Sequence, residues 1–232
     1  MAAAAPAGAS RPSAWPMYRA LVGVGMVCGL LIVTVYVLTG PLIARNEAAA
    51  LQAAVFEVLP GAVTSTSLTL SRDGSLQPAT EEGAAQAVIH AGYDAAGELV
   101  GVAIPAQGMG YQDVIRVLYG YSPAAGAIVG LRVLASKETP GLGDKIEKDP
   151  VFRANFDALD VSLAPDGESL AHPISLVKGG GKTSPWQVDG ITGATISSRA
   201  IADMLRLSSA YWVPRLYPLR GELARRGGDR DG

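Results

Sequence analysis

The chain has 232 residues and a formal net charge of −2, with 19 lysines and arginines against 21 aspartates and glutamates. This balance gives no electrostatic reason to expect a nucleic acid as partner. The single cysteine, Cys28, excludes an intramolecular disulfide and a cysteine-ligated iron–sulfur or zinc site. Because 49% of the residues are hydrophobic, the composition favours a folded domain over a disordered chain.

The N-terminal part contains a long apolar run. Residues 1–18 are rich in Ala and Pro and are predicted to be disordered. Residues 20–44 carry no charge, and the run is long enough to cross about 30 Å of hydrocarbon as a helix, which needs roughly 20 residues. We predict a transmembrane helix over 19–44, because the apolar region of a cleaved signal peptide is shorter, about 7–15 residues.

Charges on either side of this run predict its orientation. Arg11 and Arg19 precede it without an acidic residue, whereas Arg45 after it is soon followed by Glu47. By the positive-inside rule, the N-terminus is cytoplasmic. The sequence therefore predicts a single-pass protein of the bacterial inner membrane, with its main domain in the periplasm.

Beyond the membrane run, the pattern changes from helical to strand-like. Apolar spacings of three and four predict a connecting helix over 45–62, which Pro60-Gly61 terminates. Short apolar runs separated by Gly, Pro and Asp then predict the strands of a mostly antiparallel sheet. These runs cover residues 63–70, 84–93, 98–106, 113–121 and 127–135. The last two flank a turn cluster and are predicted to form a hairpin.

Helices are predicted after the strands, near 149–159 and from about 198 to 211. The predicted fold class is therefore α+β, with one N-terminal transmembrane helix followed by a single domain over 63–216, a normal domain size. The tail over 217–232 is charged and Gly-rich, and it is predicted to be flexible.

The segment DGITGATISS, residues 189–198, carries hydroxyl side chains and glycines directly before a helical pattern. One interpretation is purely structural: Ser197 or Ser198 caps the helix and Gly193 occupies a turn. The other is functional, because a glycine-lined turn that leads into a helix N-terminus presents amides and a favourable dipole to a phosphate. Both interpretations can hold together, and the residues alone do not decide whether such a phosphate is transient, structural or covalent.

This segment resembles the flavin-attachment signature Asp-x-x-Ser/Thr-Gly-Ala-Thr of FMN-binding domains in Rnf complexes and in the sodium-pumping NADH:quinone reductase. The signature positions are filled by Asp189, Thr192, Gly193, Ala194 and Thr195. The resemblance implies that FMN is the cofactor, bound covalently through a phosphoester to Thr195 and installed by a separate flavin transferase. Small residues before Thr195 would leave its hydroxyl accessible to that enzyme.

A second segment, SKETPGLGDKIE at residues 136–147, is by itself typical of a surface turn with solvated charges. Together with DGITGATISS, however, its string ETPGLGDKIE resembles the G subunit of Rnf complexes in order and spacing. The resemblance implies that this loop lies beside the flavin, where its glycines let the backbone approach the ring and its polar side chains contact the ring or the ribityl chain. The residues it assigns to the cofactor here are Glu138, Thr139, Gly141, Leu142 and Gly143.

The resemblance extends from the membrane run to about Ala202, with one departure. Family members commonly have a Gly-Tyr-x-Gly-x-Ile element before the central hairpin. Here Gly110-Tyr111 and Ile115 are kept, but Asp113 stands where Gly is expected. The departure concerns the wall of the flavin pocket and leaves the attachment site untouched.

The leading hypothesis is a membrane-anchored flavoprotein subunit whose covalent FMN relays electrons in an ion-translocating ferredoxin–NAD oxidoreductase, in contact with other subunits and with membrane lipid. No Gly-x-Gly-x-x-Gly follows a strand, so an electron-transfer subunit is predicted and not a complete enzyme, with no catalytic residue and no metal ligand assigned. The alternatives are the C subunit of a sodium-translocating NADH:quinone reductase, a stand-alone membrane flavoprotein, or a flavin-free assembly or binding module.

Overall fold

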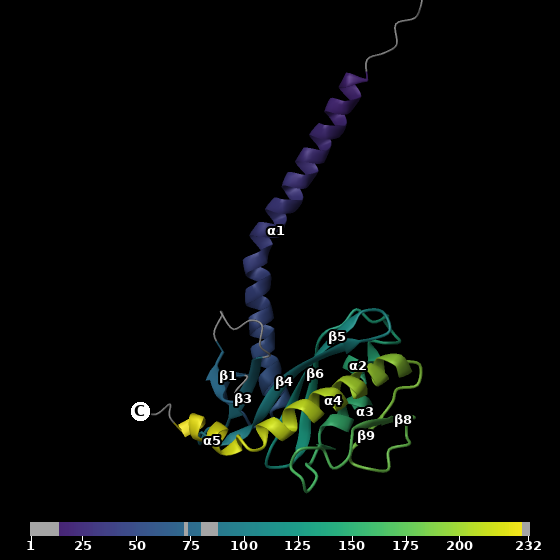
Figure 1. Ribbon diagram of the computed structural model, residues 1–232. Helices are drawn as coiled ribbons and strands as arrows, with labels where there is room; N and C mark the ends of the chain where they lie inside the picture. Colours follow the sequence, from purple (N-terminus) through teal and green to yellow (C-terminus); the bar gives the residue numbers. More distant parts are fainter. Residues whose placement is uncertain (1–13, 72–73, 80–87, 229–232) are drawn as a thin grey trace, which may run out of the picture. The chain divides into compact units, whose positions relative to one another are not determined.

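The computed structural model describes residues 14–71, 74–79 and 88–228, and the chain divides into two compact units, residues 1–49 and 50–232. The described part of the first unit is helix α1 (Trp15–Val58), which continues into the second unit. Its N-terminal part is apolar and long enough to cross a membrane, in agreement with the helix predicted over 19–44 (Figure 1). Most of the predicted cytoplasmic segment, residues 1–13, lies outside the described residues.

The last turns of α1 are part of the domain. The helix ends at Val58, just before the Pro60-Gly61 pair that was predicted to terminate it, and Gly61 takes a φ of 95° that favours glycine. Ala54, Val55 and Val58 are buried there. The predicted connecting helix is therefore the end of α1 and not a separate element.

The domain is built on a seven-stranded sheet in the order β2-β1-β3-β4-β5-β6-β7, and all of its pairings are antiparallel. The strands are β1 (Thr64–Leu70), β2 (Leu76–Pro78), β3 (Val88–Tyr93), β4 (Leu99–Met109), β5 (Val114–Ser122), β6 (Ala127–Ala135) and β7 (Leu159–Asp160). Each of the five predicted runs overlaps one of the long strands, of which β4 and β5 extend beyond the predicted ends, and the predicted hairpin joins β5 to β6. The start of the run over 84–93 lies outside the described residues.

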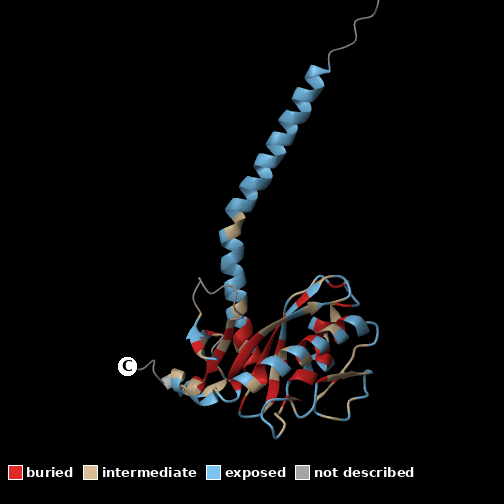
Figure 2. Ribbon diagram, viewed as in Figure 1, coloured by how far each residue is buried: buried red, intermediate tan, exposed pale blue. Residues whose placement is uncertain are grey.

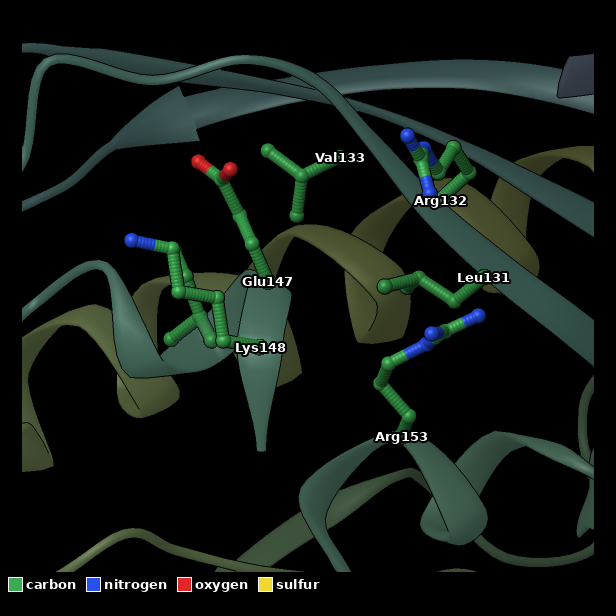
Figure 3. Close-up of a pocket in the computed structure, with 7 residues that line it drawn as sticks. Leu131, Arg132, Val133, Glu147, Lys148 and Arg153 are labelled. Atoms are coloured by element: carbon green, nitrogen blue, oxygen red, sulfur yellow. The ribbon is translucent and has the colours of Figure 1, made fainter. Parts of the chain in front are cut away.

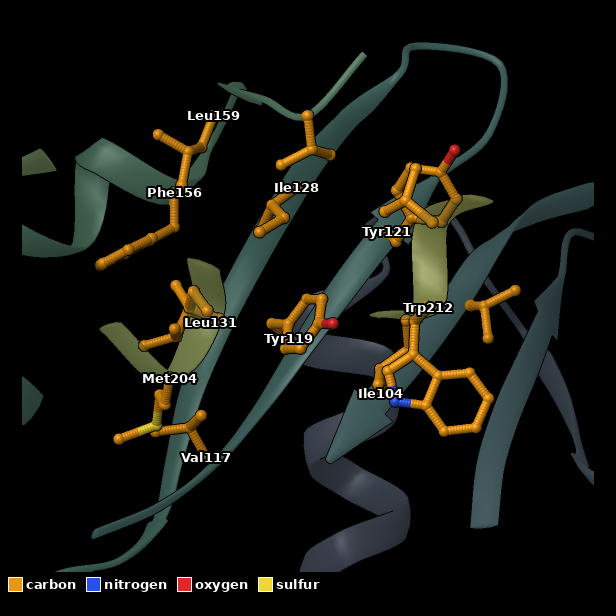
Figure 4. Close-up of a cluster of buried hydrophobic side chains, with 14 of the residues drawn as sticks. Ile104, Val117, Tyr119, Tyr121, Ile128, Leu131, Phe156, Leu159, Met204 and Trp212 are labelled. Atoms are coloured by element: carbon orange, nitrogen blue, oxygen red, sulfur yellow. The ribbon is translucent and has the colours of Figure 1, made fainter. Parts of the chain in front are cut away.

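Side chains on the strands alternate between the two faces of the sheet, and both faces are covered. On one face, Ile104 and Tyr119 belong to a large apolar cluster that includes Trp212 of helix α4 (Thr195–Leu216) (Figure 4). On the opposite face, Ala103 and Leu118 pack against the buried end of α1. Figure 2 shows the buried residues concentrated in the sheet and in the elements that cover it.

The segment between β6 and α4 differs most from the prediction. The helix expected near 149–159 is reduced to α3 (Pro150–Arg153) and a single 3-10 turn, η2 (Ala154–Phe156), before the chain enters β7. The short elements α2 (Lys145–Lys148), β8 (Ser175–Val177) and β9 (Gln187–Asp189) were not predicted, and β8 pairs with β9 in parallel. Elements of three or four residues are too short to show a hydrophobic period.

The C-terminal part is also more ordered than predicted. Within the proposed flexible tail, helix α5 (Arg220–Gly228) forms, and Leu223 is fully buried. The hydroxyl of Tyr93 donates a hydrogen bond to the carbonyl oxygen of Leu223 at 2.9 Å, and Arg226 donates one to the carbonyl oxygen of Leu76 at 2.7 Å. These contacts attach α5 to the sheet, so the prediction of a flexible tail is wrong for the described residues up to 228.

Candidate functional site

The two segments singled out in the sequence meet at one pocket of about 340 Å³. It is formed by the turn between β4 and β5, the loop that follows β6, and the first turn of α4. Its lining residues are Tyr111, Glu138, Thr139, Leu142, Gly143, Gly193, Ala194, Thr195, Ile196 and Ser197. The fold thus brings together segments that lie far apart in the sequence.

Thr195 is the first residue of α4, and its side chain is exposed at this pocket. Gly193 before it has a φ of 86°, and the nearest atom to a side chain there would be Leu142 Cδ2 at 4.0 Å, so the approach to Thr195 is open. The first turn of α4 contains no acidic residue. A helix N-terminus of this kind is favourable for a bound anion.

The serines after Thr195 do not cap the helix as predicted. The N-cap residue is Ala194, and no side chain caps it. Ser197 donates its hydroxyl hydrogen bond to Glu138 Oε2, and Ser198 donates to the carbonyl oxygen of Ala194 at 2.9 Å. Ser198 also accepts from the amide of Ile191 at 3.1 Å, so both hydroxyls are held inside the protein.

Glu138 is the charged residue at the centre of this arrangement. Its side chain is only 6% exposed, its Oε1 accepts from the Gln112 amide at 3.0 Å, and its Oε2 accepts from Ser197. Burial raises the pKa of this carboxyl, but the hydrogen bonds from the Gln112 amide, the Ser197 hydroxyl and neighbouring amides lower it more, so the pKa lies below its usual value. Glu138 is therefore ionised at neutral pH.

Two glycines leave room for this carboxylate. A Cβ atom at Gly110 would lie 2.5 Å from Glu138 Oε1, and one at Gly143 would lie 2.7 Å from Oε2. Gly143 belongs to the ETPGLGDKIE string, and Gly110 is a kept position of the element in which Asp113 departs from the family pattern. The structure gives them a common reason, which is close packing around Glu138.

Asp113, the departure from the family pattern, lies at the exposed edge of the β4–β5 turn. Its carboxylate forms an ion pair with Lys137 Nζ at 2.6 Å, and the hydrogen bond from Lys137 keeps the pKa of Asp113 below its usual value. Its carbonyl oxygen accepts from the Gly110 amide at 2.9 Å and closes the turn. The position where the family has Gly therefore accommodates the Asp113 side chain, which is partly exposed and pairs with Lys137 of the neighbouring loop.

Three of the predicted site residues do not line the pocket. Asp189 accepts hydrogen bonds from the amides of Gly181 and Lys182, both at 2.9 Å, and its own amide donates to Asn155 Oδ1 at 2.9 Å. Gly141 has a φ of 79° and holds the loop in shape. Thr192 is exposed beside the pocket segment. Asp189 is therefore bonded to backbone amides outside the pocket, and Gly141 occupies a turn position of the loop that lines it.

Other pocket residues were not assigned to the cofactor from the sequence. Tyr111 and Ile196 are 68% and 54% exposed and form apolar parts of the lining. Outside the pocket, Asn155 of η2 is 5% exposed and accepts a hydrogen bond from the backbone amide of Asp189. A polar residue in the apolar segment PVFRANF was the only sequence signal for Asn155.

A second pocket, of about 250 Å³, lies between β6, α2 and α3 and contains none of the predicted site residues (Figure 3). Its arginines, Arg132 and Arg153, both donate to Glu57 Oε1, at 3.1 and 3.0 Å. These two arginines thus attach the end of α1 to the domain. Among the described residues, no group of three or more His, Cys, Asp or Glu side chains could hold a metal ion.

Comparison with known proteins places the pocket in a family. Residues 110–208, which include every lining residue, match the FMN-binding domain. The G subunit of the ion-translocating oxidoreductase complex of Methanosarcina acetivorans is 31% identical over 191 residues, covering 82% of this chain and 90% of that protein. The chain belongs to the family of G subunits of ion-translocating oxidoreductase (Rnf) complexes. A shorter match joins it to another member: the G subunit of the Na(+)-translocating ferredoxin:NAD(+) oxidoreductase complex of Acetobacterium woodii is 34% identical over 113 residues, 48% of this chain and 49% of that protein.

Solved structures share the fold of this Rnf family member. NqrC of Shewanella oneidensis superposes with a TM-score of 0.60 at 20% identity, covering 78% of this chain and 99% of that chain. The C subunit of the Na(+)-translocating NADH-quinone reductase of Parabacteroides distasonis gives 0.56 at 19% identity, with 74% and 94% covered. The α+β class predicted from the sequence is therefore confirmed.

The ETPGLG loop of this Rnf family member provides a first test of the site. We expect Gly143→Ala to lower both the thermal stability and the flavin content, because the added methyl overlaps Glu138, and overpacking of this kind costs about 1–3 kcal/mol. Lys145→Ala in the segment that follows is the matched control, and a surface change of this kind stays within roughly 0.5 kcal/mol. Thermal unfolding and flavin absorbance of the purified full-length variants measure both effects. Equal losses in the two variants would contradict the packing argument.

Proposed function

We propose that this chain carries FMN in the pocket between the loop after β6 and the start of α4, esterified through its phosphate to Thr195, and that it relays electrons between other subunits of a membrane complex. The observation that supports this most is that Thr195 is an exposed residue and lines a pocket whose other wall is the ETPGLG loop. A covalent acceptor must be reachable by another enzyme, and Thr195 meets that requirement.

The chemistry of the lining fits a flavin. The pocket volume is within the range of small-molecule sites, about 300–1,000 Å³. Tyr111, Leu142 and Ile196 expose 68%, 52% and 54% of their surface around it, which suits the flat apolar faces of the ring. The polar side chains of the lining are Glu138, Thr139, Thr195 and Ser197, and the hydroxyl of Ser197 is bound to Glu138. In a lining of this kind the few polar groups fix the orientation of the ligand, and the apolar side chains provide most of the contact area.

The start of α4 fits the phosphate. A phosphate on the first residue of a helix benefits from the helix dipole, and no acidic residue in the first turn opposes it. Arg199 follows Thr195 by one helical turn, and long side chains on a helix lean toward the preceding turn. Within the described part of the chain, Arg199 forms no ion pair, whereas Asp203 pairs with Arg206 instead. Arg199 is thus available to neutralise the phosphate.

A bound flavin supplies the electron transfer, and the residues of the chain hold it, exclude water from one side and set its surroundings. The chain has no Gly-x-Gly-x-x-Gly motif after a strand, so the nicotinamide chemistry of the complex belongs to other subunits. In this proposal the protein is an electron carrier within a larger assembly. Its maturation requires a flavin transferase.

Topology is a separate part of the proposal. Because Arg11 and Arg19 precede the membrane run and little positive excess follows it, we propose that the domain lies in the periplasm of the host cell. We expect alkaline phosphatase fused after Gly232 to be active. A cytoplasmic reporter that is active at the same position would contradict this orientation.

The alternatives separate experimentally. A flavin-free assembly module would show no fluorescence on a denaturing gel after co-expression with a matching flavin transferase, whereas the proposed function requires a fluorescent band. The quinone-reductase alternative is disfavoured, since the long match is to an Rnf protein and the solved quinone-reductase structures share only the fold at about 20% identity. Genes for other Rnf subunits beside this one would support the assignment further.

A further inference from the structure

We propose that Glu138 is a positioning residue that joins the three segments of the pocket and that its buried negative charge lowers the reduction potential of the flavin. The proposal rests on the proposed function, since it requires FMN on Thr195. It assigns Glu138 a role through the protein, where the family resemblance implied a direct polar contact with the ring or ribityl chain.

The positioning role follows from how the carboxylate is used. Oε1 binds the amide of Gln112 in the β4–β5 turn, and Oε2 binds the hydroxyl of Ser197 in the first turn of α4. Glu138 itself belongs to the loop after β6, so one side chain connects all three segments that form the pocket. Gly110 and Gly143 enclose the same carboxylate so closely that neither position has room for a Cβ atom.

The electrostatic role follows from what is missing around the carboxylate. Within the part of the chain that the structure describes, no lysine, arginine or histidine forms an ion pair with Glu138. Its charge is stabilised by hydrogen-bond donors that carry no net charge. A full negative charge therefore remains in the lining of the pocket, in surroundings that screen it less than water does.

Reduction of the flavin then occurs against this charge. Each electron that the flavin accepts from a partner redox subunit adds one negative charge to the pocket unless a proton accompanies it. A fixed carboxylate nearby disfavours that added charge, and charge near the ring is one of the ways in which a protein tunes a flavin. Removing the charge while keeping the shape should therefore raise the potential.

The test compares two charge-removing substitutions in the flavinylated full-length protein. Glu138→Gln keeps the shape and the acceptor for the Gln112 amide, and Glu147→Gln removes an exposed charge outside the flavin pocket. Mass spectrometry first confirms FMN on Thr195 in the wild type, and its absence there would refute the proposed function instead. With FMN present, we expect spectroelectrochemical titration to give a more positive potential for Glu138→Gln and an unchanged one for Glu147→Gln. Equal potentials in all three proteins would overturn the proposal.

Ser197→Ala separates charge from packing, because it removes one hydrogen-bond donor and leaves the carboxylate charged. Its potential should stay at or below that of the wild type, and a rise as large as in Glu138→Gln would overturn the electrostatic role.

Hydrogen exchange of the unflavinylated proteins tests positioning without the cofactor. We expect faster exchange of the Gln112 amide in Glu138→Ala, which removes the acceptor of that amide, than in Glu147→Ala, whether or not Glu138→Ala takes up flavin. Unchanged exchange would overturn the positioning role.

Discussion

Thr195→Ala is expected to abolish covalent flavin binding completely. Only a hydroxyl at this position can form the proposed phosphoester, and the neighbouring hydroxyls cannot replace it. Ser197 and Ser198 are 2% and 0% exposed and are hydrogen-bonded inside the protein, so the transferase cannot reach them. Thr192 is exposed but does not line the pocket, and a misplacement near 1 Å can already cost about a hundredfold in rate. In-gel fluorescence after co-expression with the transferase measures the loss.

Thr195→Ser is the matched variant for this prediction. It keeps the hydroxyl and loses only a methyl group, so we expect partial labelling, reduced because the serine side chain is less restricted in rotamer than threonine. A fluorescent Thr195→Ala protein of wild-type intensity would show that another residue carries the flavin.

Gly120→Ala is expected to destabilise the domain. A Cβ atom on Gly120 would overlap the carbonyl oxygen of Val58, which is backbone and cannot move aside as a side chain can. A Cβ atom on Gly130 of the next strand would lie 2.7 Å from the same carbonyl oxygen, so the end of α1 packs against glycines of the sheet. Overpacking against backbone costs at least about 1–3 kcal/mol, which corresponds to roughly 2–4 °C in Tm for each kcal/mol in a domain of this size.

Gly221→Ala is the control for Gly120→Ala. It lies in α5 with open space around the added methyl, and alanine has the higher helix propensity. Its melting temperature, measured by circular dichroism of the full-length protein in detergent, should equal or exceed that of the wild type. If Gly120→Ala melted at the same temperature as Gly221→Ala, this would contradict the inference that the end of α1 packs closely against Gly120 of the sheet.

Much of the fold was predictable because its long elements have a clear period. The membrane run, the antiparallel strands and the β5–β6 hairpin follow from apolar length, alternation and turn residues. Helix α5 was missed because the segment GELARRGG is dominated by charge, and a single leucine, Leu223, provides the burial that anchors it. The start of α4 was placed three residues too late, since serines before a helical pattern are usually caps, whereas Ser197 here binds Glu138.

The candidate site was predictable in its location and less so in its internal roles. The two family motifs indicated which segments meet, and the structure brings them together at one pocket. The motifs did not show that Asp189 holds the loop amides of Gly181 and Lys182, or that Asn155 holds Asp189. Such long-range hydrogen bonds between polar side chains and backbone leave no periodic pattern in a sequence. Tyr111 and Ile196 were likewise visible only once the fold placed them at the pocket.

Peptide mass spectrometry shows whether the flavin is linked covalently to Thr195. Trypsin cleaves after Lys182 and Arg199 and releases residues 183–199, which contain Thr195 together with the neighbouring hydroxyl residues Thr192, Ser197 and Ser198. After co-expression with a matching flavin transferase, the peptide should gain the mass of FMN less one water, since ester formation releases water. Fragmentation should place the added mass on Thr195. An unmodified peptide, or a flavin located on Thr192, would contradict the account.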